Sequence, residues 1–144
     1  MSLEAKISGL MKGVVHKIHH ESTVAEAAAV LLAKDIGSLV VMGANGPVGL
    51  ITARDILRKV TTARADPAGV RVRDVMSSPL ISVGAGASVG EAAKKMIDMK
   101  IKRLGVTDDQ GGLAGIVTMT DIVGYVAKQE ELSDSLIRYL MHVV

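Results

Sequence analysis

The chain has 144 residues, enough for one compact domain with a buried core. Hydrophobic residues make up 49% of it and charged residues 22%, a globular balance that argues against disorder. Phe, Trp and Cys are absent, so the core must be aliphatic, and disulfides and cysteine chemistry are excluded. A net charge of +2 is too small to indicate nucleic acid by itself, and no apolar run approaches the ~18–20 residues of a membrane helix. We therefore expect a soluble cytoplasmic protein without a signal peptide.

The sequence repeats itself with an offset of 65 residues. Residues 7–28 align with residues 72–93 without a gap. One extra residue in the second turn then shifts the offset to 66, and GLITARDI (49–56) aligns with GIVTMTDI (115–122). The chain is therefore predicted to contain two copies of one structural unit.

Both copies predict the same order of elements: strand, helix, strand, strand, helix. Thr23 and Ser88 each stand three residues before a Glu, which is the capping-box signature of a helix start. Apolar residues at helical spacing follow, and then two β-rich runs joined by turn residues. A second helix is predicted to start at Thr52 or Thr118. The predicted strands are residues 16–18, 38–42 and 48–51 in the first copy, and residues 80–82, 103–107 and 113–117 in the second.

One copy alone is too small to close a core and leaves an apolar face of its sheet open. Two copies packed sheet to sheet with pseudo-twofold symmetry bury that face and create paired clefts. The fold class is therefore predicted as α+β, with the first repeat at residues 1–65 and the second at residues 66–127. Residues 128–144 are predicted to form an amphipathic helix that closes the core or contacts a partner, and a dimer contact is favoured.

These motifs resemble the cystathionine-β-synthase (CBS) domain pair, also called a Bateman module, over residues 5–127. The resemblance rests on Asp74-Val75-Met76 with Ser78-Pro79, on the two helix starts, and on the G-h-h-T-x-x-D-I ending of both copies. It implies a regulatory ligand, AMP, ADP or ATP, with S-adenosylmethionine or a dinucleotide as the alternative, and no required cofactor. It further implies a flat homodimer that regulates an unidentified protein.

Thr52-x-x-Asp55 and Thr118-x-x-Asp121 are the sharpest candidate sites. A Thr followed three residues later by an acid has a purely structural explanation as a helix cap, worth about 1 kcal/mol. The same carboxylate can accept two hydrogen bonds from a ribose diol, while the helix N-terminus attracts anions. The two interpretations are compatible.

The resemblance also implies which segments meet. Backbone and side chains of Leu80 and Ile81 would face adenine, and two cations would bind phosphates. The second cleft has Gly37 and Ser38 where the first has its cations. Replacing Arg103 by Ala is therefore predicted to weaken nucleotide binding more than Ser38→Ala. The main cleft comprises Thr52, Asp55, Leu80, Ile81, Lys102 and Arg103, and the second cleft Thr118, Asp121, Val15, His16, Ile18 and Ser38.

His16, His19 and His20 cluster around the first strand and suggest a metal site. No carboxylate or cysteine partner is convincingly spaced nearby, and alternation along a strand would separate the side chains of His19 and His20. We therefore predict no metal site here.

The stretch 54–73 is rich in Arg and Lys and offers the alternative of a nucleic-acid-binding or assembly protein. It lacks interleaved aromatic residues, so a solvated helix end and linker is favoured. No nucleophile–base pair or Gly-rich phosphate loop is found either, and the chain is predicted not to be an enzyme.

Overall fold

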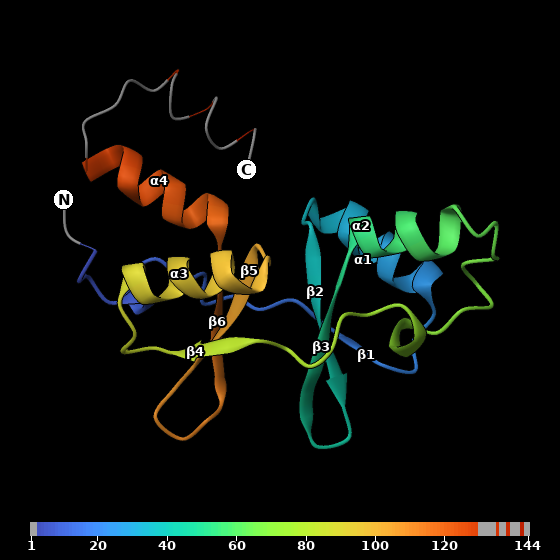
Figure 1. Ribbon diagram of the computed structural model, residues 1–144. Coiled ribbons are helices and arrows are strands. Elements are labelled where there is room, and N and C mark those ends of the chain that lie inside the picture. The colour runs from blue at the N-terminus through green and yellow to red at the C-terminus, as the bar shows by residue number, and fades with distance from the viewer. Residues whose placement is uncertain (1–2, 130–134, 136–137, 139–141, 143–144) are drawn as a thin grey trace. The chain divides into compact units, whose positions relative to one another are not determined.

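The computed structural model describes residues 3–129 together with residues 135, 138 and 142. Most of the helix predicted at 128–144 lies outside these described residues. The chain forms two compact units (Figure 1). The central unit is Val15–Ile81, and the terminal unit combines Met1–Val14 with Ser82–Val144. The repeats in the sequence and the compact units in space are therefore not divided at the same points.

Each unit contains the predicted α+β order of elements. The two β-α-β-β-α series start at Lys17 and Ser82. Leu80 and Ile81 were predicted to lie in the first strand of the second series, but they precede it. The reason is that Ser82 is the first residue that pairs with the neighbouring strand. In the central unit the elements are β1 (Lys17–His19), α1 (Val24–Lys34), β2 (Ser38–Gly43), β3 (Gly46–Thr52), α2 (Ala53–Ile56), the π-helical η2 (Leu57–Thr61) and the 3-10 turn η3 (Val72–Asp74). In the terminal unit they are the 3-10 turn η1 (Ile7–Gly9), β4 (Ser82–Gly84), α3 (Val89–Met99), β5 (Arg103–Thr107), β6 (Leu113–Thr118) and α4 (Met119–Gln129).

The two sheets have the same topology and register. β1 runs parallel to β2 and β2 antiparallel to β3, and β4, β5 and β6 repeat this order. Lys17 pairs with Val40, and Ser82 pairs with Gly105, each 65 residues further along the chain. Both hairpins carry an irregularity at the same place, after Val41 and after Val106. The internal repeat predicted from the sequence is thereby confirmed at the level of single residues.

The helix starts are also confirmed. Oγ1 of Thr23 accepts a hydrogen bond from the Glu26 N–H at 3.1 Å, and Oγ of Ser88 accepts one from the Glu91 N–H at 3.0 Å. Both helices are 11 residues long and end on a residue with left-handed backbone, Asp35 or Lys100. In the described part of the chain, no helix is both long enough and apolar enough to cross a membrane.

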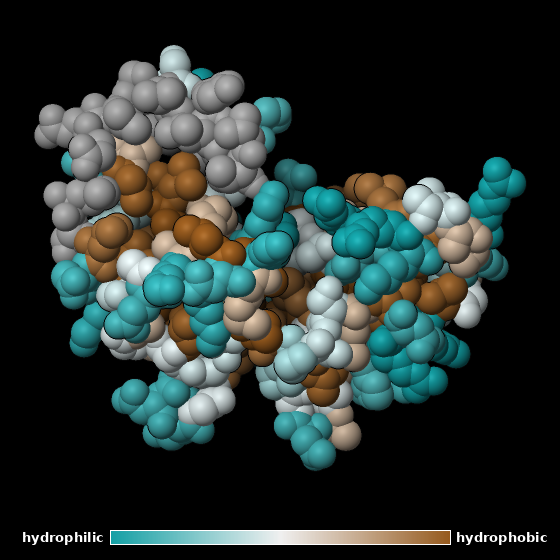
Figure 2. Space-filling model, in the orientation of Figure 1, coloured by the Kyte–Doolittle hydropathy of each residue, from teal (hydrophilic) through white to brown (hydrophobic). Residues whose placement is uncertain are grey.

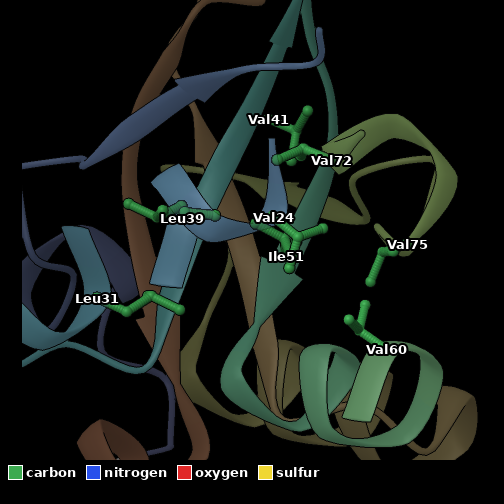
Figure 3. Close-up of a cluster of buried hydrophobic side chains, with 9 residues drawn as sticks. Val24, Leu31, Leu39, Val41, Ile51, Val60, Val72 and Val75 are labelled. Atoms are coloured by element: carbon green, nitrogen blue, oxygen red, sulfur yellow. The ribbon is translucent and has the colours of Figure 1, made fainter. Parts of the chain in front are cut away.

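The core of each unit is completed by a segment that, in the sequence, directly precedes the first strand of the other unit. We call residues 70–77 the linker strap and residues 5–12 the N-terminal strap. Val72 and Val75 of the linker strap are 0% and 2% exposed and pack into the central core with Val24, Leu39 and Ile51 (Figure 3).

The N-terminal strap has the equivalent place in the terminal unit. Ile7 is 0% exposed, and its N–H donates to the Ala87 carbonyl at 2.8 Å. In the linker strap the Val72 N–H donates to the Ser22 carbonyl at 2.8 Å, again 65 residues apart from its counterpart. Each strap then continues directly into the first strand of the other unit.

Candidate functional site

Both Thr/Asp pairs form complete capping boxes. The Thr52 N–H donates to Oδ2 of Asp55 at 2.9 Å, and the Asp55 N–H donates to Oγ1 of Thr52 at 3.1 Å. Thr118 and Asp121 make the same two hydrogen bonds at 2.9 and 3.1 Å. The structural interpretation of these motifs is therefore confirmed in both repeats. The capping hydrogen bonds leave the second carboxylate oxygen of each Asp without a partner inside the box.

Each carboxylate uses Oδ2 for its box, which leaves Oδ1 for other partners. Among the described residues, no buried side-chain nitrogen or oxygen lacks a hydrogen-bond partner. Oδ1 of Asp55 is therefore in contact with solvent, although the residue is only 8% exposed. Asp121 is half-buried. Both boxes thus present an oxygen that can accept hydrogen bonds from a ligand at the start of a helix.

The neighbour across the hairpin differs between the two boxes. Thr52 is the register partner of Ser38, whereas Thr118 is the register partner of Arg103. Residues directly opposite on an antiparallel pair place their side chains on the same face of the sheet. The Met119 N–H also donates to the Lys102 carbonyl at 2.9 Å. The structure therefore places Arg103 across the strand pair from Thr118 and the backbone of Lys102 beside the first residue of α4.

Sequence reasoning missed this neighbourhood and assigned Lys102 and Arg103 to the cleft of Thr52 and Asp55. The cations belong to the terminal unit and Thr52 and Asp55 to the central unit, so that pairing stays a prediction. Counting outward from the turn 108–112 would place residue 103 opposite residue 117, and the irregularity after Val106 moves its partner to Thr118.

Leu80 and Ile81, by contrast, belong to the same unit as Thr52 and Asp55. Both are half-buried and follow the linker strap. The strap is joined to the strand that ends in Thr52, because Leu50 and Ser77 exchange two backbone hydrogen bonds of 2.9 and 2.8 Å. The backbone hydrogen bonds between Leu50 and Ser77 thus connect the segment of the predicted adenine-facing residues to the strand of the predicted ribose-binding residues.

The residues predicted to complete the second cleft lie in the central unit. Val15, His16 and Ile18 are half-buried, and the His16 carbonyl accepts the Val40 N–H at 2.9 Å. Thr118 and Asp121 lie in the terminal unit, and their pairing with these residues also stays a prediction.

The prediction that strand alternation separates His19 and His20 is wrong. The two rings have their centroids 4.7 Å apart. β1 ends at His19, so the chain turns before His20 and alternation no longer applies. Nδ1 of His19 accepts the Glu21 N–H at 3.1 Å. Within the described residues, no group of three His, Cys, Asp or Glu side chains is placed to hold a metal ion.

The basic stretch 54–73 includes cations that hold the linker strap. Nζ of Lys59 donates to the Val75 carbonyl at 2.8 Å, and Nη1 of Arg71 donates to the Glu21 carbonyl at 3.0 Å. Arg73 forms an ion pair with the Glu21 carboxylate. Figure 2, in which the central unit lies to the right, shows many hydrophilic residues on its visible face. Part of this positive charge therefore has a structural use.

Comparison with known proteins adds the family. The family model for the CBS domain matches the chain twice, at residues 7–62 and 72–128. An uncharacterised protein of Methanopyrus kandleri is 43% identical over 102 residues, which are 70% of this chain and 52% of that relative. The chain thus spans about half the length of this curated relative.

Solved structures give the same result. A CBS domain protein from Pyrobaculum aerophilum, complexed with AMP, superposes with a TM-score of 0.74 at 28% identity, covering 81% of this chain and 89% of that chain. A hexameric CBS-CP12 protein from bloom-forming cyanobacteria has a TM-score of 0.77 at 27% identity, covering 85% of this chain and 68% of that one. With two family matches, a repeated β-α-β-β-α fold and two Thr/Asp boxes, the chain belongs to the CBS-domain family and carries a pair of CBS repeats.

Proposed function

We propose that this CBS pair is a regulatory module that binds an adenosine-containing nucleotide, AMP, ADP or ATP, and transmits its presence to a protein partner. The duplicated Thr/Asp box carries the proposal, because it places a carboxylate oxygen with free acceptor capacity at a helix start in both repeats. The AMP complex of the Pyrobaculum aerophilum relative supports the choice of ligand.

The chemistry of the box suits a ribose. Oδ2 is fixed by the Thr N–H, so the carboxylate is held in one orientation without a ligand. Oδ1 can then accept a hydrogen bond from a ribose hydroxyl, while the Thr hydroxyl oxygen accepts the Asp N–H. Leu80 and Ile81 would cover the adenine ring at the first site, with their backbone groups reading its polar edge.

Phosphate binding is assigned to Lys102 and Arg103, since a guanidinium can hold a phosphate through two hydrogen bonds. The resemblance to the family implies that these cations serve the box of Thr52 and Asp55. The observed register supports the box of Thr118 and Asp121 instead, where Arg103 is the cross-strand neighbour. A double-mutant cycle decides between them, because Arg103 must couple to the carboxylate whose ligand it shares.

Calorimetric titration with AMP and with ATP tests the proposal through Asp55→Asn and Asp121→Asn. The Asn side-chain oxygen can still accept the Thr N–H, so the cap survives, but its amide presents a donor where the ribose needs an acceptor. We expect each substitution to weaken one binding event about tenfold or more. Glu26→Gln is the matched control, because it changes the first turn of α1 outside both boxes.

Unchanged affinity in both Asn variants would refute the ribose-binding role of the boxes. Titration with S-adenosylmethionine and with a dinucleotide in the same series determines which adenosine ligand is preferred.

The proposed assembly is a homodimer. The hexameric relative supports self-association in this family. Light scattering on the purified chain, with and without AMP, measures the mass of the assembly, and a monomeric mass at micromolar concentration would contradict this part of the proposal.

A further inference from the structure

Gly49 on β3 lies where a side chain has no room. A Cβ built there would stand 2.5 Å from the carbonyl oxygen of Ser77 and 2.9 Å from Sδ of Met76. Both atoms belong to the linker strap, and one of them is backbone, which cannot rotate away. Gly115 on β6 has the same environment, 2.7 Å from the Lys12 carbonyl oxygen and 2.8 Å from Sδ of Met11. In each unit a strap therefore lies directly against a glycine of the last strand.

The straps also take the hydrogen bonds of the open sheet edge. β3 and β6 are edge strands, whose outward N–H and C=O groups would otherwise lack strand partners. Leu50 and Ser77 exchange hydrogen bonds of 2.9 and 2.8 Å, and Lys12 and Ile116 exchange hydrogen bonds of 2.9 and 3.2 Å. The glycine next to each pair lets the strap approach closely enough to make them.

In the sequence, the two hydrogen-bonded residues of the central unit stand close to the residues of the proposed first site. Leu50 is two residues before Thr52, and Ser77 is three residues before Leu80. All of these residues belong to the central unit. The contact between Gly49 and the strap therefore fixes the adenine-facing segment relative to the ribose-binding box.

We propose that Gly49 and the linker strap are positioning elements of the nucleotide site, which set its affinity without touching the ligand. This inference rests on the proposed nucleotide-binding function. The strap is anchored at its other end by Val72 and Val75 in the core, so a displacement at Ser77 passes toward Leu80 and Ile81 and not into the core. Within the terminal unit, Gly115 and the N-terminal strap make the equivalent contact at β6.

Gly49→Ala tests the inference in the full chain, with AMP as the probe and calorimetry as the measurement. The added methyl group must push the strap away, and we expect AMP binding at the site that Asp55→Asn weakens to fall about tenfold. Gly43→Ala is the matched control. Its Cβ would stand 2.7 Å from Cγ1 of Val48, so it crowds the same sheet, but at the hairpin and away from the strap.

Titrations are made well below the melting temperature of the less stable variant, so that both proteins are folded. A merely structural role of Gly49 would lower the melting temperature of both variants and leave both affinities at the wild-type value. A positioning role lowers the affinity of Gly49→Ala alone. Amide hydrogen exchange at Leu50 and Ser77 should rise in Gly49→Ala and stay unchanged in Gly43→Ala.

Met76→Ala supplies a second variant that cannot clash, in case Gly49→Ala does not fold. Removal of the thioether from the face of Gly49 should loosen the strap and weaken AMP binding by a smaller factor in the same direction. Wild-type affinity in every folded strap variant would overturn the inference while leaving the nucleotide function intact. If the wild-type protein itself does not bind AMP or any other adenosine ligand, the proposed function fails first.

Discussion

The central and terminal units are built on one plan, yet their boxes differ in burial, in neighbours and in the helix that follows. Asp55 is only 8% exposed, whereas Asp121 is half-buried. Arg103 stands opposite Thr118, where the central unit has Ser38 opposite Thr52.

The helix after the first box has four α-helical residues and then a π-helical segment, whereas α4 runs for 11 residues. Duplication has thus kept the box and changed its surroundings. The same internal hydrogen bonds therefore do not make the two boxes equivalent.

The largest expected effect concerns the straps. Ile7 and Val72 occupy equivalent positions and are both 0% exposed. Ile7→Ala should destabilise the terminal unit by about 2–5 kcal/mol, although residue 7 belongs to the first repeat in the sequence. Val72→Ala should destabilise the central unit by about 2 kcal/mol. Residue-resolved hydrogen exchange checks this at Val106 and Val41. If Ile7→Ala increased hydrogen exchange at Val41 and left Val106 unchanged, the packing of the N-terminal strap into the terminal unit would be wrong.

The next effect concerns the two carboxylates as caps. Asp55→Ala should lower the free energy of unfolding by about 1–2 kcal/mol, because the Thr52 N–H loses the partner that the buried Asp55 carboxylate provides. Asp121→Ala should cost less, about 0.5–1 kcal/mol, since water can replace the carboxylate at a half-buried box. Urea unfolding of both variants measures the difference. Equal losses would show that the burial of Asp55 has no energetic consequence.

The third prediction concerns the residues opposite the boxes. Arg103→Ala should weaken ATP binding about tenfold, because a phosphate loses a bidentate partner. Ser38→Ala should change ATP affinity by less than about twofold, since a serine offers one neutral hydrogen bond that water can replace. Calorimetric titration of both variants makes the comparison. Similar losses in the two would show that the difference between Ser38 and Arg103 has no part in phosphate binding.

A double-mutant cycle sharpens that result. Arg103→Ala combined with Asp121→Asn should give less than the sum of the single effects if both residues hold one ligand, whereas Arg103→Ala with Asp55→Asn should then be additive. The reverse pattern would assign the cations to the first site.

The smallest effect is expected on the exposed face of α3. Nζ of Lys94 donates to Oδ2 of Asp98 at 2.8 Å, and this hydrogen bond raises the pKa of Lys94 above its ordinary 10.5. A raised folded-state pKa stabilises the fold below the unfolded value and loses that contribution as the pH rises through the folded value. Because the pair is fully exposed, Asp98→Asn should leave thermal stability near pH 7 almost unchanged. A clear drop in the melting temperature would contradict this.

The repeated fold could be predicted from the sequence because its local signals agree. The capping residues Thr23 and Ser88, the hairpin turns and the offset of 65 residues all indicate the same elements, and the structure confirms them. The strands β1 and β4 were misplaced by one or two residues, because three-residue strands carry too little alternation to fix their ends.

Local sequence signals could not predict that each strap packs on the sheet of the other repeat. A local pattern shows that residues 5–12 and 70–77 are alike, but not which sheet each one covers. That choice depends on contacts such as Ile116 with Lys12, more than one hundred positions apart in the chain. The pairing of Arg103 with Thr118 depends on the irregularity after Val106, without which hairpin register would pair Arg103 with Val117, and the sequence carries no local signal for that irregularity.

Nucleotide binding by the Thr/Asp boxes is tested by a thermal-shift panel with AMP, ADP, ATP and S-adenosylmethionine. A ligand that binds only the folded state stabilises it, by about 2.7 kcal/mol at one hundred times its Kd. We predict that at least one of these ligands raises the melting temperature of the wild-type protein, and that the shift shrinks in Asp55→Asn and vanishes in the double variant with Asp121→Asn. No shift with any of the four ligands, or an undiminished shift in the double variant, would contradict the account.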